Sequence, residues 1–429
     1  MWKSIRKFGM SYCDLPTMLA NVDFFLRFLT LKIDTRNKKR IPLPFYVATV
    51  ISAACYFYVY LISMAWFVAK CARVGAVLPA LIVLSLGVSS ELGTIKLCCM
   101  FYYNVVKCAP ILNCFLIFYF WASFNNNQTI YLRFHKNLMS TLKLVKKRAV
   151  IFWIVLIGNG IVYIMKPIFL PGRHLMEDTF SFDLFTGLEP IFQSPNYEIA
   201  FTVMAIGVYV TVYLPANITA FLIIISGYIE AQMLAWSKEL LHLWDDAENY
   251  YIKVFADRSI NGIRNNKNAV INEFIKRRLE VIITGHSANI TVLRQIEDVF
   301  RTALAVEFSL LIVGLIAELL GGLENTYMEI PYALMQVAMD CLTGQRLIDA
   351  SLVFERAVYD CRWEIMDNDN KRIVLMMLQN SQKAMALTAG GITKLSFSCL
   401  MSVLRSIYSL LTQFYDTQER KELWVYADT

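Results

Sequence analysis

The chain has little charge and few residues that interrupt helices. Asp, Glu, Lys and Arg make up 17% of its 429 residues, whereas soluble domains carry about 25%. Hydrophobic residues make up 57%, and 18 glycines and 11 prolines leave no room for a large disordered or collagen-like region. A chain of this length with so few charges cannot keep its surface hydrated. The composition therefore argues against a soluble multidomain protein and predicts a membrane protein.

The sequence also lacks the residue groups that catalysis and metal binding need. It has no GxSxG, HExxH, Walker A or kinase motif. Its four histidines are far apart, and most of its ten cysteines fall inside apolar runs, where a thiol behaves as a small hydrophobe. We therefore expect no enzyme activity, no metal site and no cofactor. The net charge of +7 does not predict nucleic-acid binding, because the basic residues lie between apolar blocks.

Seven apolar blocks have, or approach, the length needed to cross a bilayer. They cover residues 42–69, 76–103, 149–170, 199–228, 302–323, 330–344 and 386–415. A transmembrane helix takes about 20 apolar residues, so the short sixth block needs protein neighbours. A further block, 108–124, contains Pro110 and Asn113, and we expect it to be buried or interfacial. The expected fold is all-α, a polytopic membrane protein with seven transmembrane helices.

The distribution of charge orients these spans. Residues 104–148 hold seven basic side chains and no acidic one, whereas residues 171–198 hold one basic and five acidic side chains. Cytoplasmic loops are enriched in Lys and Arg, so we expect a cytoplasmic N-terminus and an extracellular C-terminus. The chain is expected to begin with a cytosolic N-terminus (1–41), spans 1–4 (42–228) and a cytosolic helical anchor (229–300). Spans 5 and 6 (301–344), cytosolic anchor helices (345–385), span 7 (386–415) and an extracellular tail (416–429) follow.

Two regions outside the spans have the periodicity of amphipathic helices. In the first, the apolar residues lie at helical spacing after Asp14, which can cap the helix, and Pro16. They are Leu15, Met18, Leu19, Val22, Leu26 and Leu29. This helix lies at the membrane interface or is docked on the rest of the protein. In the second region, apolar stripes over 230–244 and 269–300 predict that spans 4 and 5 continue into the cytosol, with a separate soluble hairpin as the alternative.

Several ionisable residues fall within or near the expected spans. They are Glu91, Lys96, Glu307, Glu318, Asp340 and Arg405. Such residues are candidates for function because charge is costly in lipid. Lys96, Glu318 and Asp340 lie near expected helix ends, where side chains can reach the headgroups, so we expect these three to be structural. Arg405, in the middle of the last span, is the exception.

The C-terminal third resembles a known receptor family. The segments that carry the likeness are Cys341–Gln345 (CLTGQ), Leu347–Asp349 (LID), Cys361–Trp363 (CRW) and the closing segment 395–412, with His286 in GHSANITVL. Together with the length and the inverted seven-span topology, they are similar to insect odorant receptors, and EAQMLA at 230–235 looks like moth members. Two features depart from the family: the apolar block 108–124 and the 15 residues after Phe414.

The resemblance implies the ligand-binding subunit of an odorant-gated non-selective cation channel. Such receptors form heterotetramers with an olfactory co-receptor in the plasma membrane of sensory dendrites. The implied ligand is a small volatile apolar molecule, an odorant or pheromone, bound among spans 2, 3, 4 and 6. The walls carried over by helix depth are Leu84, Val88, Asn159, Tyr163, Met204, Val208, Thr211, Tyr332, Met335, Gln336 and Met339. The implied pore and gate residues are Ser406, Ser409, Leu410, Gln413 and Phe414. For each of these residues, plain helix packing is the alternative.

Two other receptor classes are weighed against this interpretation. Gustatory receptors share the architecture but typically end in Thr-Tyr-x5-Gln-Phe, and this chain has Ser406-Ile407 before its Gln413-Phe414. A G-protein-coupled receptor is less favoured, because its N-terminus lies outside the cell and the Asn-Pro-x-x-Tyr and Asp/Glu-Arg-Tyr motifs are absent. The gustatory-type ligand-gated channel is therefore the principal alternative.

Overall fold

The apolar blocks of the sequence form long helices in the computed structural model, which describes residues 8–31, 33, 41–102, 128–176, 190–255, 267–320, 328–409 and 412–413. The α-helices are α2 (Leu15–Arg27), α3 (Leu43–Tyr56), α4 (Met64–Val74), α5 (Val77–Tyr102), α7 (Gln128–Phe169), α9 (Asn196–Leu241), α10 (Leu243–Phe255), α11 (Lys267–Leu320), α13 (Glu329–Tyr359), α14 (Asn368–Ser381) and a helix over 397–409. A π-helix, η1 (Phe57–Ser63), joins α3 to α4, and a short 3-10 helix, η5 (Trp363–Ile365), precedes α14. The expectation of a helical membrane protein is confirmed.

Five helical segments of the described chain are long and apolar enough to cross a membrane. They are Leu43–Val74, Val77–Met100, Thr129–Phe169, Asn196–Leu241 and Lys267–Leu320, and each overlaps most of one of the first five predicted blocks. The sixth and seventh blocks fall on α13 and on the helix over 397–409, which were not found to meet these criteria within the described residues. The count of seven spans and the position of the C-terminus therefore stay predictions.

Three helices are much longer than a bilayer is thick: α7, with 42 residues, and the two longest, α9 and α11. α9 has 46 residues and α11 has 54. At about 1.5 Å per residue, α11 extends about 80 Å, against about 30 Å for the hydrocarbon core. As predicted, α9 continues past block 199–228 and α11 begins well before block 302–323, and α10 follows α9 after a break at His242. The cytosolic position of these extensions stays a prediction. The alternative of a separate hairpin is wrong, because α11 runs unbroken from Lys267 to Leu320.

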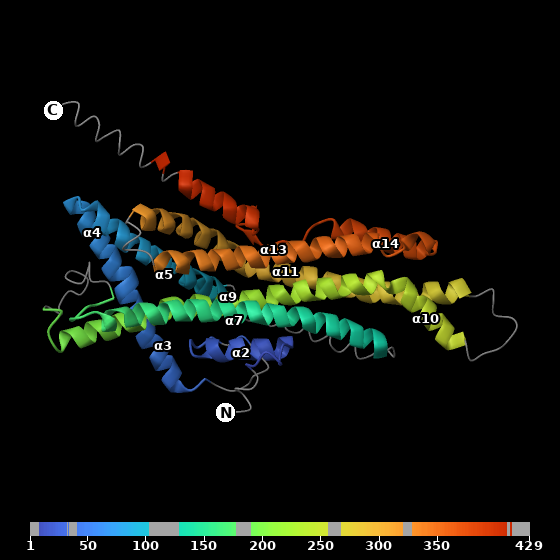
Figure 1. Cartoon of the computed structure of the whole chain (residues 1–429), viewed down its shortest axis with the longest axis horizontal. Helices are drawn as coiled ribbons and strands as arrows, with labels where there is room; N and C mark the ends of the chain where they lie inside the picture. The colour runs from blue at the N-terminus through green and yellow to red at the C-terminus, as the bar shows by residue number, and fades with distance from the viewer. Residues whose placement is uncertain are drawn as a thin grey trace.

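α9 is the central helix of the bundle. In its most apolar stretch 94% of residues are buried, against 22% in α7 and 17% in the helix from Leu43 to Val74. α7 lies antiparallel beside α9 along the long axis (Figure 1), and α13 packs on α9 as well. α5 packs mainly on α11. Apolar residues therefore face protein on α9 and are left for lipid on α7 and α3.

The N-terminal amphipathic helix forms as predicted and docks on this bundle. Asp14 caps α2 by accepting a hydrogen bond from the Thr17 backbone N–H at 3.1 Å. The apolar stripe is buried, and the Tyr213 hydroxyl on α9 donates to the backbone oxygen of Phe25 at 2.9 Å. The structure thus has the docked arrangement, with Phe24 exposed on the outer side of the helix.

The last helix begins later than the sequence suggested. Residues Thr388–Ala389 (β1) and Thr393–Lys394 (β2) form a small antiparallel hairpin. Gly390 and Gly391 at its turn have φ values of +65° and +78°, a conformation that side chains with a Cβ rarely adopt. The predicted start of the last span at residue 386 is therefore corrected to 397. Block 108–124, Leu410, Phe414 and the tail 416–429 lie outside the described residues.

Candidate functional site

A cavity of about 40 Å³ lies where η1, α5, α7, α9 and α13 meet. Its walls are Tyr60, Leu86, Ser89, Ser90, Asn159, Gly160, Tyr163, Val208, Thr211, Val212, Met328, Glu329 and Tyr332. Mostly apolar walls with a few polar groups are typical of small-molecule sites. A space of this size holds one or two water molecules and is smaller than a typical ligand pocket. A ligand larger than that requires the helices around the cavity to move apart.

Part of the predicted ligand site is assembled here. Five of the expected residues line the cavity: Asn159, Tyr163, Val208, Thr211 and Tyr332. The other six do not: Leu84, Val88, Met204, Met335, Gln336 and Met339.

Helical phase explains the division on α5, and depth along the helix explains the absence of Gln336 on α13. On α5 the cavity face carries Leu86, Ser89 and Ser90, whereas Val88 lies beside Gly314 of α11. On α13, Gln336 is fully buried one turn beyond Tyr332. Neither of the two residues predicted on α5 lines the cavity, and only one of the four predicted on α13 does. That this cavity is the ligand site stays a prediction.

Sequence reasoning missed the contributions of η1 and of the start of α13. Tyr60 and Glu329 both line the cavity. Ser89 and Ser90, which follow an apolar stretch of α5, were a signal that could have identified its cavity face. Gly160 also has a steric role, since a Cβ there would lie 2.8 Å from Cγ2 of Val212.

The polar groups around the cavity differ in whether they have hydrogen-bond partners. The Tyr332 hydroxyl donates to the backbone oxygen of Thr211 at 2.8 Å, and Asn159 Nδ2 donates to the backbone oxygen of Met328 at 3.3 Å. The buried hydroxyl of Tyr163 has no hydrogen-bond partner within the described part of the chain. A buried hydroxyl without a partner costs stability, so Tyr163 is available to a ligand.

A cluster of charged side chains lies deeper in the same bundle. Lys96 Nζ is 2.9 Å from Glu307 Oε2 and 2.7 Å from Asp340 Oδ2, and all three side chains are fully buried. Lys96 also donates to Thr219 Oγ1 at 3.0 Å. The prediction that Lys96 and Asp340 reach the headgroups is wrong, because α9, α11 and α13 continue past the expected ends of the spans and enclose them.

Glu318 is buried as well, two residues before α11 ends at Leu320. Its side chain is fully buried, and its Oε1 accepts a hydrogen bond from Ser89 Oγ at 2.9 Å. The expectation that Glu318 reaches the headgroups is therefore also wrong. Ser89 lines the cavity, so this contact joins α11 to the cavity wall.

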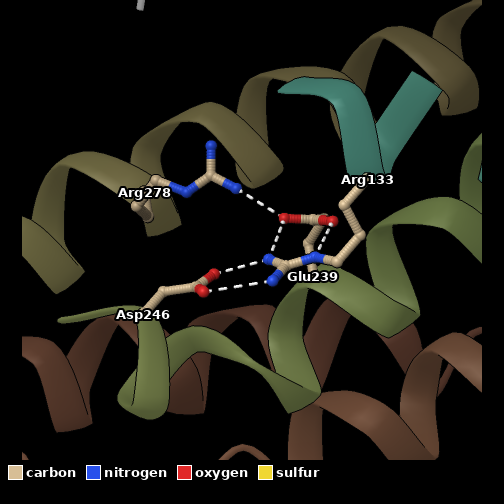
Figure 2. A network of polar contacts seen from close by, with 4 residues as sticks. All are labelled: Arg133, Glu239, Asp246 and Arg278. Carbon is tan, nitrogen blue, oxygen red and sulfur yellow. Dashed lines mark hydrogen bonds and ion pairs between the residues drawn. The ribbon is translucent and has the colours of Figure 1, made fainter. Parts of the chain in front are cut away.

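A second polar network joins four helices in the predicted cytosolic region. Figure 2 shows Arg133 of α7 between the carboxylates of Glu239 (α9) and Asp246 (α10), with Arg278 of α11 on the far side of Glu239. Arg133 Nη2 is 2.8 Å from Glu239 Oε2, and Arg278 Nη2 is 2.9 Å from the same oxygen. The hydrogen bonds that Arg133 donates to Glu239 and Asp246 raise the pKa of its guanidinium above the ordinary value. Two guanidinium groups and two carboxylates balance in charge, which fixes α7, α9, α10 and α11 together.

His286 lies on the buried side of α11 in the same region. Its ring stacks on Phe354 of α13 with centroids 4.6 Å apart. Residue 286 precedes the expected start of span 5 at 302 by 16 positions, about 24 Å along a helix. Burial lowers the pKa of His286 to about 4, so the ring packs against Phe354 in its neutral form.

The last helix presents polar side chains to the outside of the single chain. Ser402, Arg405, Ser406 and Ser409 are exposed, and so is Gln413, whereas Ile407 is buried against the bundle. Such a face is suited to water or to a neighbouring subunit and not to lipid.

Comparisons with known proteins connect this architecture to receptors. A family model described as 7tm odorant receptor matches residues 79–408. The odorant receptor coreceptor of Aedes aegypti is 25% identical over 165 residues, covering 36% of this chain and 34% of that protein. The coreceptor of Anopheles gambiae is 34% identical over 76 residues, covering 18% of this chain and 16% of that protein. The chain thus spans about a third of the first relative and less of the second.

The fold is similar to that of a solved receptor over nearly its whole length. The structure of the insect olfactory receptor OR5 from Machilis hrabei has a TM-score of 0.67 and covers 93% of this chain and 98% of its own, at 12% identity. A second structure, of the same receptor in complex with eugenol, has a TM-score of 0.65 at 12% identity. At this identity the likeness shows the fold alone.

Proposed function

Because this chain belongs to the odorant receptor family, as the match over residues 79–408 shows, we propose that it is the ligand-binding subunit of an odorant-gated cation channel. The observation that carries the proposal is the cavity, which lies among α5, α7, α9 and α13. These are the four helices in which family placement predicted the ligand. The olfactory co-receptor is the proposed partner, in a heterotetramer in the plasma membrane of sensory dendrites.

The walls of the cavity favour a small, mostly apolar ligand that carries one polar group. Leu86, Val208, Val212 and Met328 offer apolar contact. Tyr163 offers a hydroxyl that needs a partner. One structure of the Machilis hrabei receptor is of its complex with eugenol. This complex supports a small-molecule ligand for the present chain. A volatile molecule with one hydrogen-bonding oxygen fits this combination.

The helix over 397–409 is the proposed pore lining. Its exposed serines and Gln413 would face a shared axis when several subunits assemble. Leu410 and Phe414, outside the described residues, are the proposed hydrophobic gate. An apolar ring narrower than a hydrated ion closes a pore by excluding water. Replacement of Leu410 by Ser is expected to raise ligand-free current or alter ion selectivity.

Ligand-evoked current tests the proposed function directly. Cells that express the chain with the co-receptor, the chain alone and the co-receptor alone are exposed to a panel of volatile alcohols, phenols, esters and aldehydes while G-protein signalling is blocked. We expect a current that requires both subunits and survives the block. A response abolished by the block, or no response to any compound despite surface expression, would contradict the proposal.

A further inference from the structure

The buried cluster of Lys96, Glu307 and Asp340 joins three helices at one point. Lys96 lies on α5, Glu307 on α11 and Asp340 on α13, and Thr219 of the central helix α9 accepts a hydrogen bond from the same ammonium. Two carboxylates and one ammonium, each fully buried, are costly in a membrane protein. None of the three lines the cavity. Neither ligand contact nor access to the headgroups therefore explains the cluster.

α13 connects this cluster to the cavity. Tyr332, Gln336 and Asp340 follow one another at four-residue spacing, so they lie on one stripe of the helix. Tyr332 lines the cavity, Gln336 is fully buried below it, and Asp340 is bound by Lys96. A shift of the whole α13 helix that widens the cavity at Tyr332 would therefore also change the distance between Asp340 and Lys96.

The same stripe continues to the start of the last helix. Gly344, one turn beyond Asp340, lies so close to Leu395 that an added Cβ would overlap the Leu395 backbone oxygen. The next residue, Gln345, accepts a hydrogen bond from the Phe397 backbone N–H at 3.3 Å. Phe397 is the first residue of the helix over 397–409. α13 thus contacts the cavity near its first turn and the base of the proposed pore helix near its middle.

We propose that Lys96 is a positioning residue for gating: by binding Asp340 and Glu307 it holds α13 in the position that couples the cavity to the last helix. This inference rests on the proposed function. The attraction between buried charges changes steeply with distance because the surrounding dielectric constant is low. Few positions of α13 therefore keep both contacts of the ammonium, and the cluster favours one arrangement over its neighbours. Polar residues inside a core are best attested in such a register-setting role.

Two variants and a matched control test the proposal in the complex with the co-receptor. The first variant removes all three charges while keeping side-chain size (Lys96→Met, Glu307→Gln and Asp340→Asn), so that no buried charge is left without a partner. The second, Lys96→Arg, keeps the charge and changes its geometry. The control replaces another largely buried ion pair, Arg148 with Glu230 at 2.6 Å, by Met and Gln. That pair joins α7 to α9 and does not involve α13.

Surface expression, ligand-free current and the ligand concentration for half-maximal current are measured for each protein. We expect both cluster variants at the cell surface, with half-maximal concentration or ligand-free current changed by about fivefold or more. The ranking of ligands should not change, because the cavity wall is intact. The control should match the wild type in both quantities.

Three results would overturn the proposal. One is that both cluster variants stay within about twofold of the wild type in both quantities. Another is that the control changes as much as the cluster variants. The third is that neither cluster variant reaches the surface, which would assign the cluster to folding alone. Ligand-free current can be measured without an odorant, so it tests the role of the cluster even if the wild type responds to no odorant. A wild type that responds to no odorant would contradict the proposed function and not the role of the cluster.

Discussion

Two tyrosines of the cavity wall have different hydrogen-bonding states. Tyr332 donates to the backbone of Thr211, and Tyr163 has a buried hydroxyl without a partner in the described part of the chain. Removing a satisfied buried hydroxyl costs about 1 kcal/mol, whereas removing an unsatisfied one does not. We therefore expect Tyr332→Phe to lower thermal stability and Tyr163→Phe to leave it unchanged or raise it slightly.

The same pair separates stability from ligand recognition. Tyr163→Phe should raise the half-maximal concentration of oxygen-containing ligands by about tenfold, the value of one hydrogen bond near 1.4 kcal/mol. Melting temperature in detergent and ligand-evoked current are the measurements. Tyr209→Phe, an exposed tyrosine on α9 outside the cavity wall, is the control. Equal responses of Tyr163→Phe and wild type to every ligand would remove Tyr163 from the site.

His286 makes stability depend on pH. Its pKa falls from the ordinary value of 6.5 to about 4 because the ring is buried. The unfolded chain then binds a proton more readily than the folded one, so stability is complete above about pH 6.5 and declines as the pH falls towards 4. The expected slope is about 1.4 kcal/mol per pH unit in this window.

Melting temperature as a function of pH measures this effect in detergent. His286→Leu should show a shallower decline between pH 6.5 and 4 than the wild type, because it has no ring to protonate. His242→Gln, at an exposed position between α9 and α10, should keep the wild-type slope. If His286→Leu and wild type declined in parallel, His286 would not be the group responsible.

At the scale of elements, the four-residue network of Figure 2 ties α7, α9, α10 and α11 together. Glu239 is fully buried and contacts both Arg133 and Arg278. Removing one partner from a buried network leaves charge without compensation, which costs about 3 kcal/mol or more. We expect Glu239→Gln to lower the melting temperature and the surface level of the protein clearly.

An exposed ion pair on α11, the helix that carries Arg278, provides the comparison for Glu239→Gln. Arg277 and Glu273 of α11 are 2.9 Å apart, with 75% and 56% of their side chains exposed. Solvent screens such a pair, so Arg277→Ala should change stability by about 0.5 kcal/mol or less. Equal losses in Glu239→Gln and Arg277→Ala would show that the network is not what fixes these helices.

For the molecule as a whole, the orientation in the membrane is the prediction to test. Basic residues gather in 104–148 and acidic residues in 171–198, which places the first segment inside and the second outside. We expect a glycosylation sequon added at the N-terminus to stay unmodified and one added at the C-terminus to be modified. A shift in mass on glycosidase treatment is the measurement. Modification at the N-terminus would reverse the proposed topology.

The sequence by itself determined the class of fold and indicated that the fourth and fifth helices are long, while the structure excluded the alternative of a separate hairpin. Its apolar blocks are long enough to specify helices locally, and the stripes beyond residues 228 and 269 specify their extensions. Asp14 followed by an apolar stripe was likewise sufficient to predict where α2 begins and which of its faces is apolar, because capping and periodicity act within one or two turns. The resemblance in the C-terminal third identified the family that the match over 79–408 shows.

Only the tertiary structure decided which faces meet. Val88 and Ser89 are neighbours in sequence and both contact α11, yet Ser89 also lines the cavity and Val88 does not, because about 100° of helical rotation separates them. Lys96 and Asp340 were expected near the headgroups. They instead bind each other across 244 positions of sequence, since the extended α9, α11 and α13 enclose them. Local periodicity carries no information about such distant partners, so the cavity wall and the buried charge cluster follow from packing alone.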